Sequence, residues 1–342
     1  MRAWIEGQSV DQHEAIAAAA RMLARARLPV IGGLSGHVAA VRAAYRLAFH
    51  IGAAIDCEGS DALYADLGVL AARGAMTTTW AEARARADLL LVVGRKAGAN
   101  PLLAELVAAP APLAGVAERN VLNLEADQDT LAAHLGLLRA LATGRLSPRP
   151  ETVALNDLAG RIKAVRFGVA VYDPRELGEP AVGMLQGLVK DLNDETRFSS
   201  LPLGVPATAR LALAVGSWTT GDAPRVGLGR GYPEHDPWRF DARRLVASKE
   251  ADAALWLCAQ AHGEKPPVGI PGVVLSGRPD EAQAGIVIEV AVPGEAGMAV
   301  CFDERRGTLA AIGTGPAPRN TGAAEIIEAI QTTIGEKGQG SC

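Results

Sequence analysis

Cysteine is scarce in this 342-residue chain, and the few cysteines form no recognisable metal-binding pattern. Cys57, Cys258, Cys301 and Cys342 lie far apart, and no two of them make a C-x-x-C pair. This spacing matches neither a disulfide framework nor the usual iron–sulfur and zinc-ribbon patterns. A reducing compartment is the simplest interpretation, and we expect a cytoplasmic protein.

Long apolar runs and an excess of positive charge are also missing. No segment reaches the ~18 apolar residues that a membrane-spanning helix needs, and the N-terminal sequence MRAWIEGQSV has no apolar run behind its basic residue. The formal charge of −4 gives no attraction for nucleic acid or anionic lipid. We therefore expect neither a membrane nor a nucleic-acid partner.

The sequence does contain apolar strand-like segments that alternate with helical patterns. Near-continuous apolar runs at 88–94, 167–172 and 252–258 indicate strands of parallel sheets covered on both faces. The run LALAVG at 211–216 is likewise interpreted as a strand. Two halves of similar design, each with an Ala-Asp before a buried strand, predict an α/β protein with two Rossmann-like domains.

A stretch rich in proline and arginine, TGRLSPRPET at 143–152, is typical of a linker. It predicts a first Rossmann-like domain at 1–146 and a second at 147–334, the latter containing a long loop at 217–240. The tail at 335–342 is expected to be disordered.

Two segments have some features of ligand-binding sites. GGLSG at 32–36 follows a strand, but its glycine spacing fails the dinucleotide fingerprint, so tight strand-to-helix packing explains it better. Cys258 and His262, four residues apart at a strand end, fit a buried structural cysteine better than a metal site. With no nucleophile elbow, paired carboxylates or kinase signature, we expect no catalytic residue and no metal ligand in this chain.

The most unusual segment is SWTTGDAPRVGLGRGYPEHDP at 217–237, which has no helical or strand period. In one interpretation Arg225 and Arg230, on a glycine-rich backbone, bind a phosphate or carboxylate. In the other, the two arginines pair with neighbouring acids, while Trp218, Tyr232 and Trp238 hold a long ordered loop in place. Ordered loops of this length are often functional, so binding or docking stays open beside the structural interpretation.

These residues carry a family resemblance. The segment from Leu28 to Gly94 resembles the corresponding part of molybdopterin-type oxidoreductases, and the 217–237 segment narrows the resemblance to the family of formylmethanofuran dehydrogenase B subunits. The resemblance extends from Asp11 to about Ile334 and implies two Rossmann-like parallel-sheet domains of the molybdopterin oxidoreductase type.

The chain departs from the redox members of that family where their metal centres lie. It lacks their N-terminal iron–sulfur domain, since no cysteine precedes Cys57. Ala62 stands near the position of their cysteine or selenocysteine metal ligand, and Cys57 lies about five residues too early. The turn GRKAGANP at 94–101 keeps only Gly94, Asn100 and Pro101 of their Trp-Gly-x-Asn-Pro pattern.

A chain with these departures is similar to the B subunits of bacterial formyltransferase/hydrolase complexes. The resemblance implies a structural, non-catalytic subunit without a cofactor, in a cytoplasmic complex with an amidohydrolase-like A subunit, a C subunit and a formyltransferase D subunit. In such complexes a formyl group passes from tetrahydromethanopterin to a methanofuran-type carrier and is hydrolysed to formate, with the metal in the hydrolase subunit.

Two questions remain open at this point. The alternative function is a molybdopterin or tungstopterin formylmethanofuran dehydrogenase subunit with unusual ligands, such as Cys57 or an oxygen of Asp56 or Ser60. The loop residues that we consider possible carrier or subunit contacts are Trp218, Thr219, Thr220, Gly221, Arg225, Arg230 and Tyr232.

Overall fold

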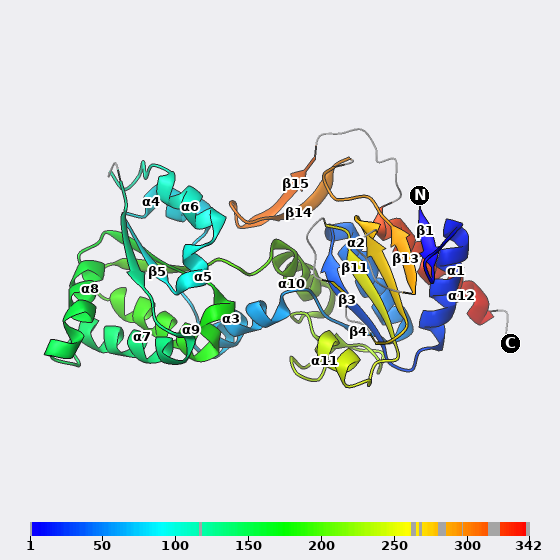
Figure 1. Ribbon diagram of the computed structural model, residues 1–342, viewed down its shortest axis with the longest axis horizontal. Coiled ribbons are helices and arrows are strands. Elements are labelled where there is room, and N and C mark those ends of the chain that lie inside the picture. The colour runs from blue at the N-terminus through cyan, green and yellow to red at the C-terminus, as the bar shows by residue number, and fades with distance from the viewer. Residues whose placement is uncertain are drawn as a thin grey trace. The chain divides into compact units, whose positions relative to one another are not determined.

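The chain forms two compact units, and the second is inserted into the first (Figure 1). The computed structural model describes residues 2–115, 118–260, 265–266, 269–279, 285–295, 297–313 and 322–339. Unit 1 comprises Met1–Ser60, Pro206–Asp303 and Leu309–Cys342, whereas unit 2 comprises Asp61–Val205 and Glu304–Thr308. Both units are α/β with parallel strands, so the predicted α/β class with parallel sheets is confirmed.

Unit 1 is built on a nine-stranded sheet in the order β10-β9-β4-β3-β11-β12-β13-β1-β2. Its strands β4, β3, β11, β12 and β13 pair in parallel, and antiparallel strands extend both edges. The bounds are β1 Ala3–Ile5, β2 Gln8–Val10, β3 Pro29–Ser35, β4 Ala54–Ile55, β9 Val226–Gly227, β10 Glu234–His235, β11 Ala253–Cys258, β12 Gly272–Ser276 and β13 Ile286–Glu289.

Helices of unit 1 pack around this sheet, and their ends follow local sequence signals. The side chain of Asp11 accepts a hydrogen bond from the backbone N–H of His13 at the start of α1, and Gly52 ends α2 in the left-handed conformation that glycine favours. The remaining elements of this unit are α1 Gln12–Arg25, α2 Val38–Ile51, α10 Ala207–Thr220, α11 Ala242–Ala247 and α12 Ala323–Gln339, together with most of the hairpin β14 Ala299–Asp303 and β15 Thr308–Ile312, whose turn Glu304–Thr308 is counted with unit 2.

Unit 2 contains a four-stranded, fully parallel sheet in the order β6-β5-β7-β8. Alternate residues of each strand point to opposite faces. Leu89 and Leu91 pack into the core formed with α7, α8 and α9, whereas Leu90 and Val92 pack into the core formed with α4, α5 and α6. Helices therefore cover both faces of the sheet (Figure 1).

In unit 2 each strand is preceded by one or two helices. Their bounds are α3 Ser60–Arg73, α4 Trp80–Arg86, β5 Leu89–Val93, α5 Arg95–Gly98, α6 Pro101–Ala108, β6 Asn120–Leu124, α7 Gln128–Ala142, a 3-10 turn at Pro150–Thr152, α8 Val153–Lys163, β7 Phe167–Tyr172, α9 Pro174–Leu192 and β8 Arg197–Pro202.

The structure corrects the predicted domain boundary at 146/147. Strand β7, beyond that boundary, pairs with β5, which precedes it, so both belong to one sheet and residues 143–152 only connect α7 to α8. Prolines and arginines mark a loop between helices as readily as a linker between domains. The chain returns to unit 1 only at Pro206, and β11 then pairs with β3.

Two further predictions are wrong. LALAVG at 211–216 lies within helix α10 and is not a strand, because a short apolar run fits a buried helix as well as a buried strand. The tail predicted to be disordered from residue 335 is helical as far as Gln339, and residues 340–342 lie outside the described part. Within the described residues, no helix is long and apolar enough to cross a membrane.

Candidate functional site

The unusual 217–237 segment is an ordered extension of the unit 1 sheet. Its first residues complete helix α10, and the short strands β9 and β10 form a hairpin beside β4. The backbone N–H groups of Arg225 and Leu228 donate to the carbonyls of Ile55 and Ala53 at 3.0 and 3.1 Å. The loop is thus tied to the sheet by backbone hydrogen bonds, and the expectation that it holds no helix or strand is wrong.

Arg225 lies at the centre of a buried charge cluster. Only 7% of this residue is exposed. Its Nε lies 3.4 Å from Oδ2 of Asp56, and its Nη2 lies 2.9 Å from Oδ2 of Asp241. The guanidinium also donates to the carbonyl of Pro237 at 2.8 Å and to Oγ of Ser60 at 2.9 Å. Arg225 therefore points inward and pairs with acids, as the structural interpretation of the loop predicts.

Asp56 is held by backbone donors as well as by Arg225. Its Oδ1 accepts the backbone N–H of Cys57 at 2.8 Å, and its Oδ2 accepts that of Ala242 at 3.1 Å. Burial raises the pKa of Asp56 to about 6, against the opposing effects of Arg225 and these N–H donors. Desolvation thus outweighs pairing at this carboxyl.

The threonines and Gly221 serve to end helix α10. The hydroxyls of Thr219 and Thr220 donate to the carbonyls of Val215 and Gly216 at 2.7 and 2.9 Å. Gly221 follows with φ 85°, the left-handed conformation that ends many helices. These contacts give the three residues a structural role in helix termination.

The other candidates of the loop are exposed to solvent. Trp218 and Tyr232 are 61% and 52% exposed, so they do not hold the loop in place as the structural interpretation supposed. The buried aromatic that does so is Phe240, whose ring lies against Gly227. Arg230 pairs at the surface with Glu234, at 3.3 Å.

Trp238 is not among the contact residues expected from the sequence, although it is the most exposed aromatic of this segment, at 72%. The guanidinium carbon of Arg244 lies 4.3 Å from the centre of its ring. Arg244 is itself held by Glu250 and by the backbone carbonyl of Trp238, at 2.5 and 2.9 Å. The indole is thus fixed in an exposed position, which only the tertiary contact with Arg244 reveals.

The glycines of the GGLSG segment make room for a neighbouring strand. A Cβ atom on Gly32 would lie 2.0 Å from the ring of Trp256 on β11, and one on Gly33 would lie 2.6 Å from the carbonyl of Leu257. Close packing therefore explains the glycines, but the partner is a strand and not the helix we expected.

The usual ligand position of unit 2 is filled by the protein itself. Since β6 and β7 lie on opposite sides of β5, the carboxyl ends of β5 and β7 form a topological switch point, where open α/β sheets bind ligands. There the carboxylate of Glu176 accepts the backbone N–H groups of Arg95 and Lys96 at 2.8 and 2.7 Å. A Cβ on Gly94 would lie 2.5 Å from this carboxylate.

The residues around the family's metal position offer a poor donor set. Ala62 is a buried methyl group, and the oxygens of Asp56 are engaged by Arg225, Ser60 and backbone N–H groups. Cys57 is buried beside them. In the described part of the chain, no three His, Cys, Asp or Glu side chains are grouped so that they could hold a metal ion; His262 lies outside that part. These residues do not fit a molybdenum or tungsten centre.

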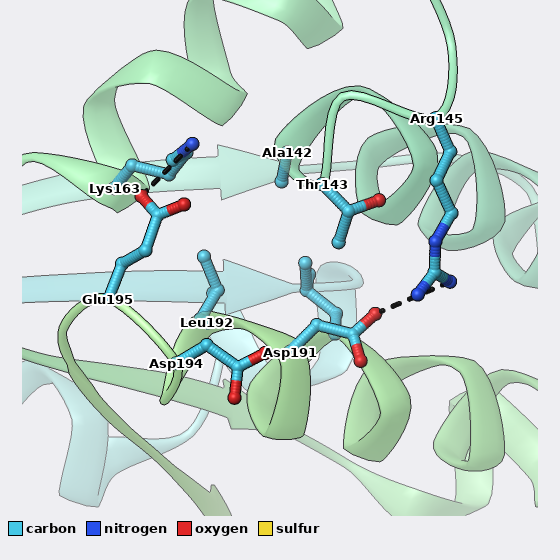
Figure 2. A pocket seen from close by; sticks show the side chains of 9 residues that line it. Ala142, Thr143, Arg145, Lys163, Asp191, Leu192, Asp194 and Glu195 are labelled. Carbon is cyan, nitrogen blue, oxygen red and sulfur yellow. Dashed lines mark ion pairs between the residues drawn. The ribbon is translucent and has the colours of Figure 1, made fainter.

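A cavity of about 200 Å³ in unit 2 contains charges of both signs (Figure 2). Lys163 pairs with Glu195 at 3.1 Å, and Arg145 pairs with Asp191 at 3.8 Å. Both cations of this cavity are thereby neutralised by acids that line the same cavity.

Comparison with known proteins identifies the family. No protein-family model matches the chain. A curated protein from Methylorubrum extorquens, the B subunit of the formyltransferase/hydrolase complex Fhc, is 44% identical over 364 residues, with 99% of each chain covered. This chain belongs to the family of that B subunit. A solved structure of the formyltransferase/hydrolase complex FhcABCD from the same species, in complex with methylofuran, contains a chain with a TM-score of 0.89 and 41% identity. That match covers 98% of this chain and 99% of the other.

Proposed function

We propose that this chain is a non-catalytic, structural subunit of a formyltransferase/hydrolase complex. In that complex other subunits transfer a formyl group from tetrahydromethanopterin to a methanofuran-type carrier and hydrolyse it to formate. The observation that carries this proposal is the similarity to the Fhc B subunit over essentially the full length of both chains. The partners are then the A, C and D subunits, and the complex acts in the cytoplasm.

The loss of chemistry in this subunit is part of the proposal. In this proposal the subunit keeps two α/β units of the molybdopterin oxidoreductase type but has lost the cofactor and the metal. The positions at the strand ends where a ligand would bind are occupied by side chains of the chain itself. Glu176 at the switch point of unit 2, the buried Asp56–Arg225 pair of unit 1 and the methyl group of Ala62 support this view.

The exposed face of the 217–240 segment is the proposed subunit contact. We define it by Trp218, Arg230, Tyr232 and Trp238, all of which are exposed. Tryptophan, tyrosine and arginine are the residues that most often dominate the binding energy of protein interfaces. A tryptophan that is already held by Arg244 loses little conformational freedom when it binds.

Co-purification tests the proposal. The chain, tagged in its native host, should recover the other subunits in fixed stoichiometry, with no stoichiometric molybdenum, tungsten or pterin in the sample. A stable chain without partners would refute the subunit role, whereas stoichiometric pterin with molybdenum or tungsten would restore the redox alternative.

Substitutions on the exposed face test the contact separately. Combining Trp218→Ala, Tyr232→Ala and Trp238→Ala should reduce recovery of the other subunits while the chain stays folded. The matched control combines Leu113→Ala and Val153→Ala, which remove exposed apolar side chains from unit 2. Equal recovery with both variants would place the contact elsewhere and leave the subunit role intact.

A further inference from the structure

Unit 2 contains a second cavity, of about 550 Å³, that differs from the one in Figure 2 in its charge. It lies beside the C-terminal end of α3 and is lined from α3, α7, α9 and the chain that follows α3. Its basic residues are Arg73, Arg139 and Lys190, and no acidic side chain is among the described residues that line it. Pockets of this volume accommodate small organic ligands.

The cations at its rim are available for binding. Neither Arg73 nor Lys190 forms an ion pair with another side chain in the described part of the chain, and both are exposed. This is the opposite of the cavity in Figure 2, where Lys163 and Arg145 each have an acidic partner. Within the described residues, Arg73 and Lys190 thus have no acidic group in direct contact, although Lys190 lies close enough to Asp191 to contribute to the lowered pKa of that carboxyl.

Arg139 adds a third cation whose orientation is fixed. Its Nε and Nη2 donate to the two carboxylate oxygens of Asp191, at 2.7 and 3.2 Å. Its Nη1 lies over helix α9, where a Cβ on Gly187 would be 2.4 Å away. Nη1 has no hydrogen-bond acceptor within the described residues, so Asp191 orients the guanidinium while this nitrogen remains free to bind.

The remaining wall is hydrogen-bonded and partly apolar. Gln186 is buried and donates to Oγ of Ser200 at 2.9 Å and to the hydroxyl of Tyr172 at 3.3 Å. Tyr172 in turn donates to Asp66, and Ser200 donates to the carbonyl of Met76 at 3.2 Å. With Gln186 committed to this network, ligand recognition falls to the cations, while the exposed Met76 side chain offers an apolar contact.

We propose that this cavity binds a small organic anion that carries at least two carboxylate or phosphate groups. Separate rim cations suit separated anionic groups, and Nη1 of Arg139 adds a donor of fixed orientation for one oxyanion. All lining residues belong to unit 2, so the site is complete within one unit. The inference goes beyond the proposed subunit role and does not depend on it.

Calorimetric titration of the full-length chain at low salt tests this site. Citrate and inorganic pyrophosphate are the probes, with acetate and glycerol as the monoanionic and neutral controls. Saturable binding of a probe that weakens with added salt, without binding of either control, supports the proposal. Tighter binding of citrate would identify carboxylate ligands, and tighter binding of pyrophosphate would identify phosphate ligands.

Two variants locate the binding. Arg73→Gln combined with Lys190→Gln should weaken the preferred probe by at least about tenfold, because two charge-assisted contacts are lost. Gly187→Ala should weaken it as well, since the added methyl displaces Nη1 of Arg139. The control, Lys163→Gln with Arg166→Gln, removes the same charge from the same unit and should leave the affinity within about twofold. No saturable binding, or equal losses in test and control variants, would overturn the proposal.

Discussion

The side chains of Asp56 and Arg225 form an ion pair inside unit 1, with Oδ2 and Nε 3.4 Å apart. One residue comes from the end of β4 and the other from the loop that follows α10, so the pair joins segments far apart in the sequence. Asp241 and Ser60 complete the cluster around the same guanidinium. The cluster explains why so long a loop is ordered.

Replacing Arg225 should strongly destabilise the protein. Arg225→Met leaves the carboxylates of Asp56 and Asp241 without their partner, and breaking a buried pair from one side costs about 3–5 kcal/mol. Arg230→Met on the same loop breaks only surface contacts, an ion pair with Glu234 and a hydrogen bond with Tyr232, so its effect on the free energy of unfolding should be far smaller. Denaturant unfolding measures both values. Similar losses in the two variants would contradict the structural role of Arg225.

The same cluster predicts a pH dependence of stability that Asp56→Asn removes. The pKa of Asp56 is about 6 in the folded protein, above its ordinary value of 3.8. Its stabilising contribution is therefore complete below pH 3.8 and is lost as the pH rises through about 6. Between pH 4 and 7 the wild type should lose on the order of 2 kcal/mol relative to Asp56→Asn.

Unfolding free energies of both proteins across this pH range test the sign of the effect. Their difference cancels the contributions of other carboxylates. Arg230→Met, which leaves the buried cluster intact, should follow the wild-type pH profile. A wild-type protein that gains stability relative to Asp56→Asn as the pH rises would show that the ion pair, and not burial, controls this carboxyl.

Much of this fold follows from patterns that are local in the sequence. The alternation of apolar runs and helical segments predicts the α/β class, and Asp11 and Gly52 mark the ends of the helices they cap. Pairing between strands that are distant in the chain has no comparable local signal in the sequence. That β7 joins β5, and β11 joins β3, depends on contacts across the chain, and this is why the inserted unit could not be predicted.

The contacts of single residues in the candidate site could not be predicted from local sequence either. Arg225 and Arg230 stand in equivalent glycine-rich surroundings in the sequence, yet one is buried against Asp56 and the other is at the surface. The role of Glu176 could not be predicted from any local pattern, because its partners Arg95 and Lys96 lie about eighty residues earlier. Residue type predicts what a group can bind, whereas the fold decides what it does bind.

Removing the carboxylate of Glu176 should expose the backbone donors at the switch point of unit 2. Glu176→Ala removes the charged acceptor of the N–H groups of Arg95 and Lys96, and because water can reach these exposed donors the cost should be about 1 kcal/mol. Amide hydrogen exchange at these two residues should accelerate. Glu179→Ala, an exposed change in the same helix, is the matched control and should affect neither. Unchanged exchange at both amides would refute the assignment.

Close packing around Gly32 predicts opposite outcomes for two glycine-to-alanine changes. In Gly32→Ala the new methyl would lie 2.0 Å from the ring of Trp256, and both groups are held in neighbouring strands of one sheet. Overpacking of this kind typically costs about 1–3 kcal/mol. In Gly160→Ala, within helix α8, the methyl meets no atom within 4 Å, and alanine favours a helix over glycine by about 1 kcal/mol. Thermal unfolding should therefore show a lower Tm for the first variant and a higher Tm for the second. A Gly32→Ala protein as stable as the wild type would mean that Trp256 can move aside, and the glycines of this segment would then need an explanation other than strand packing.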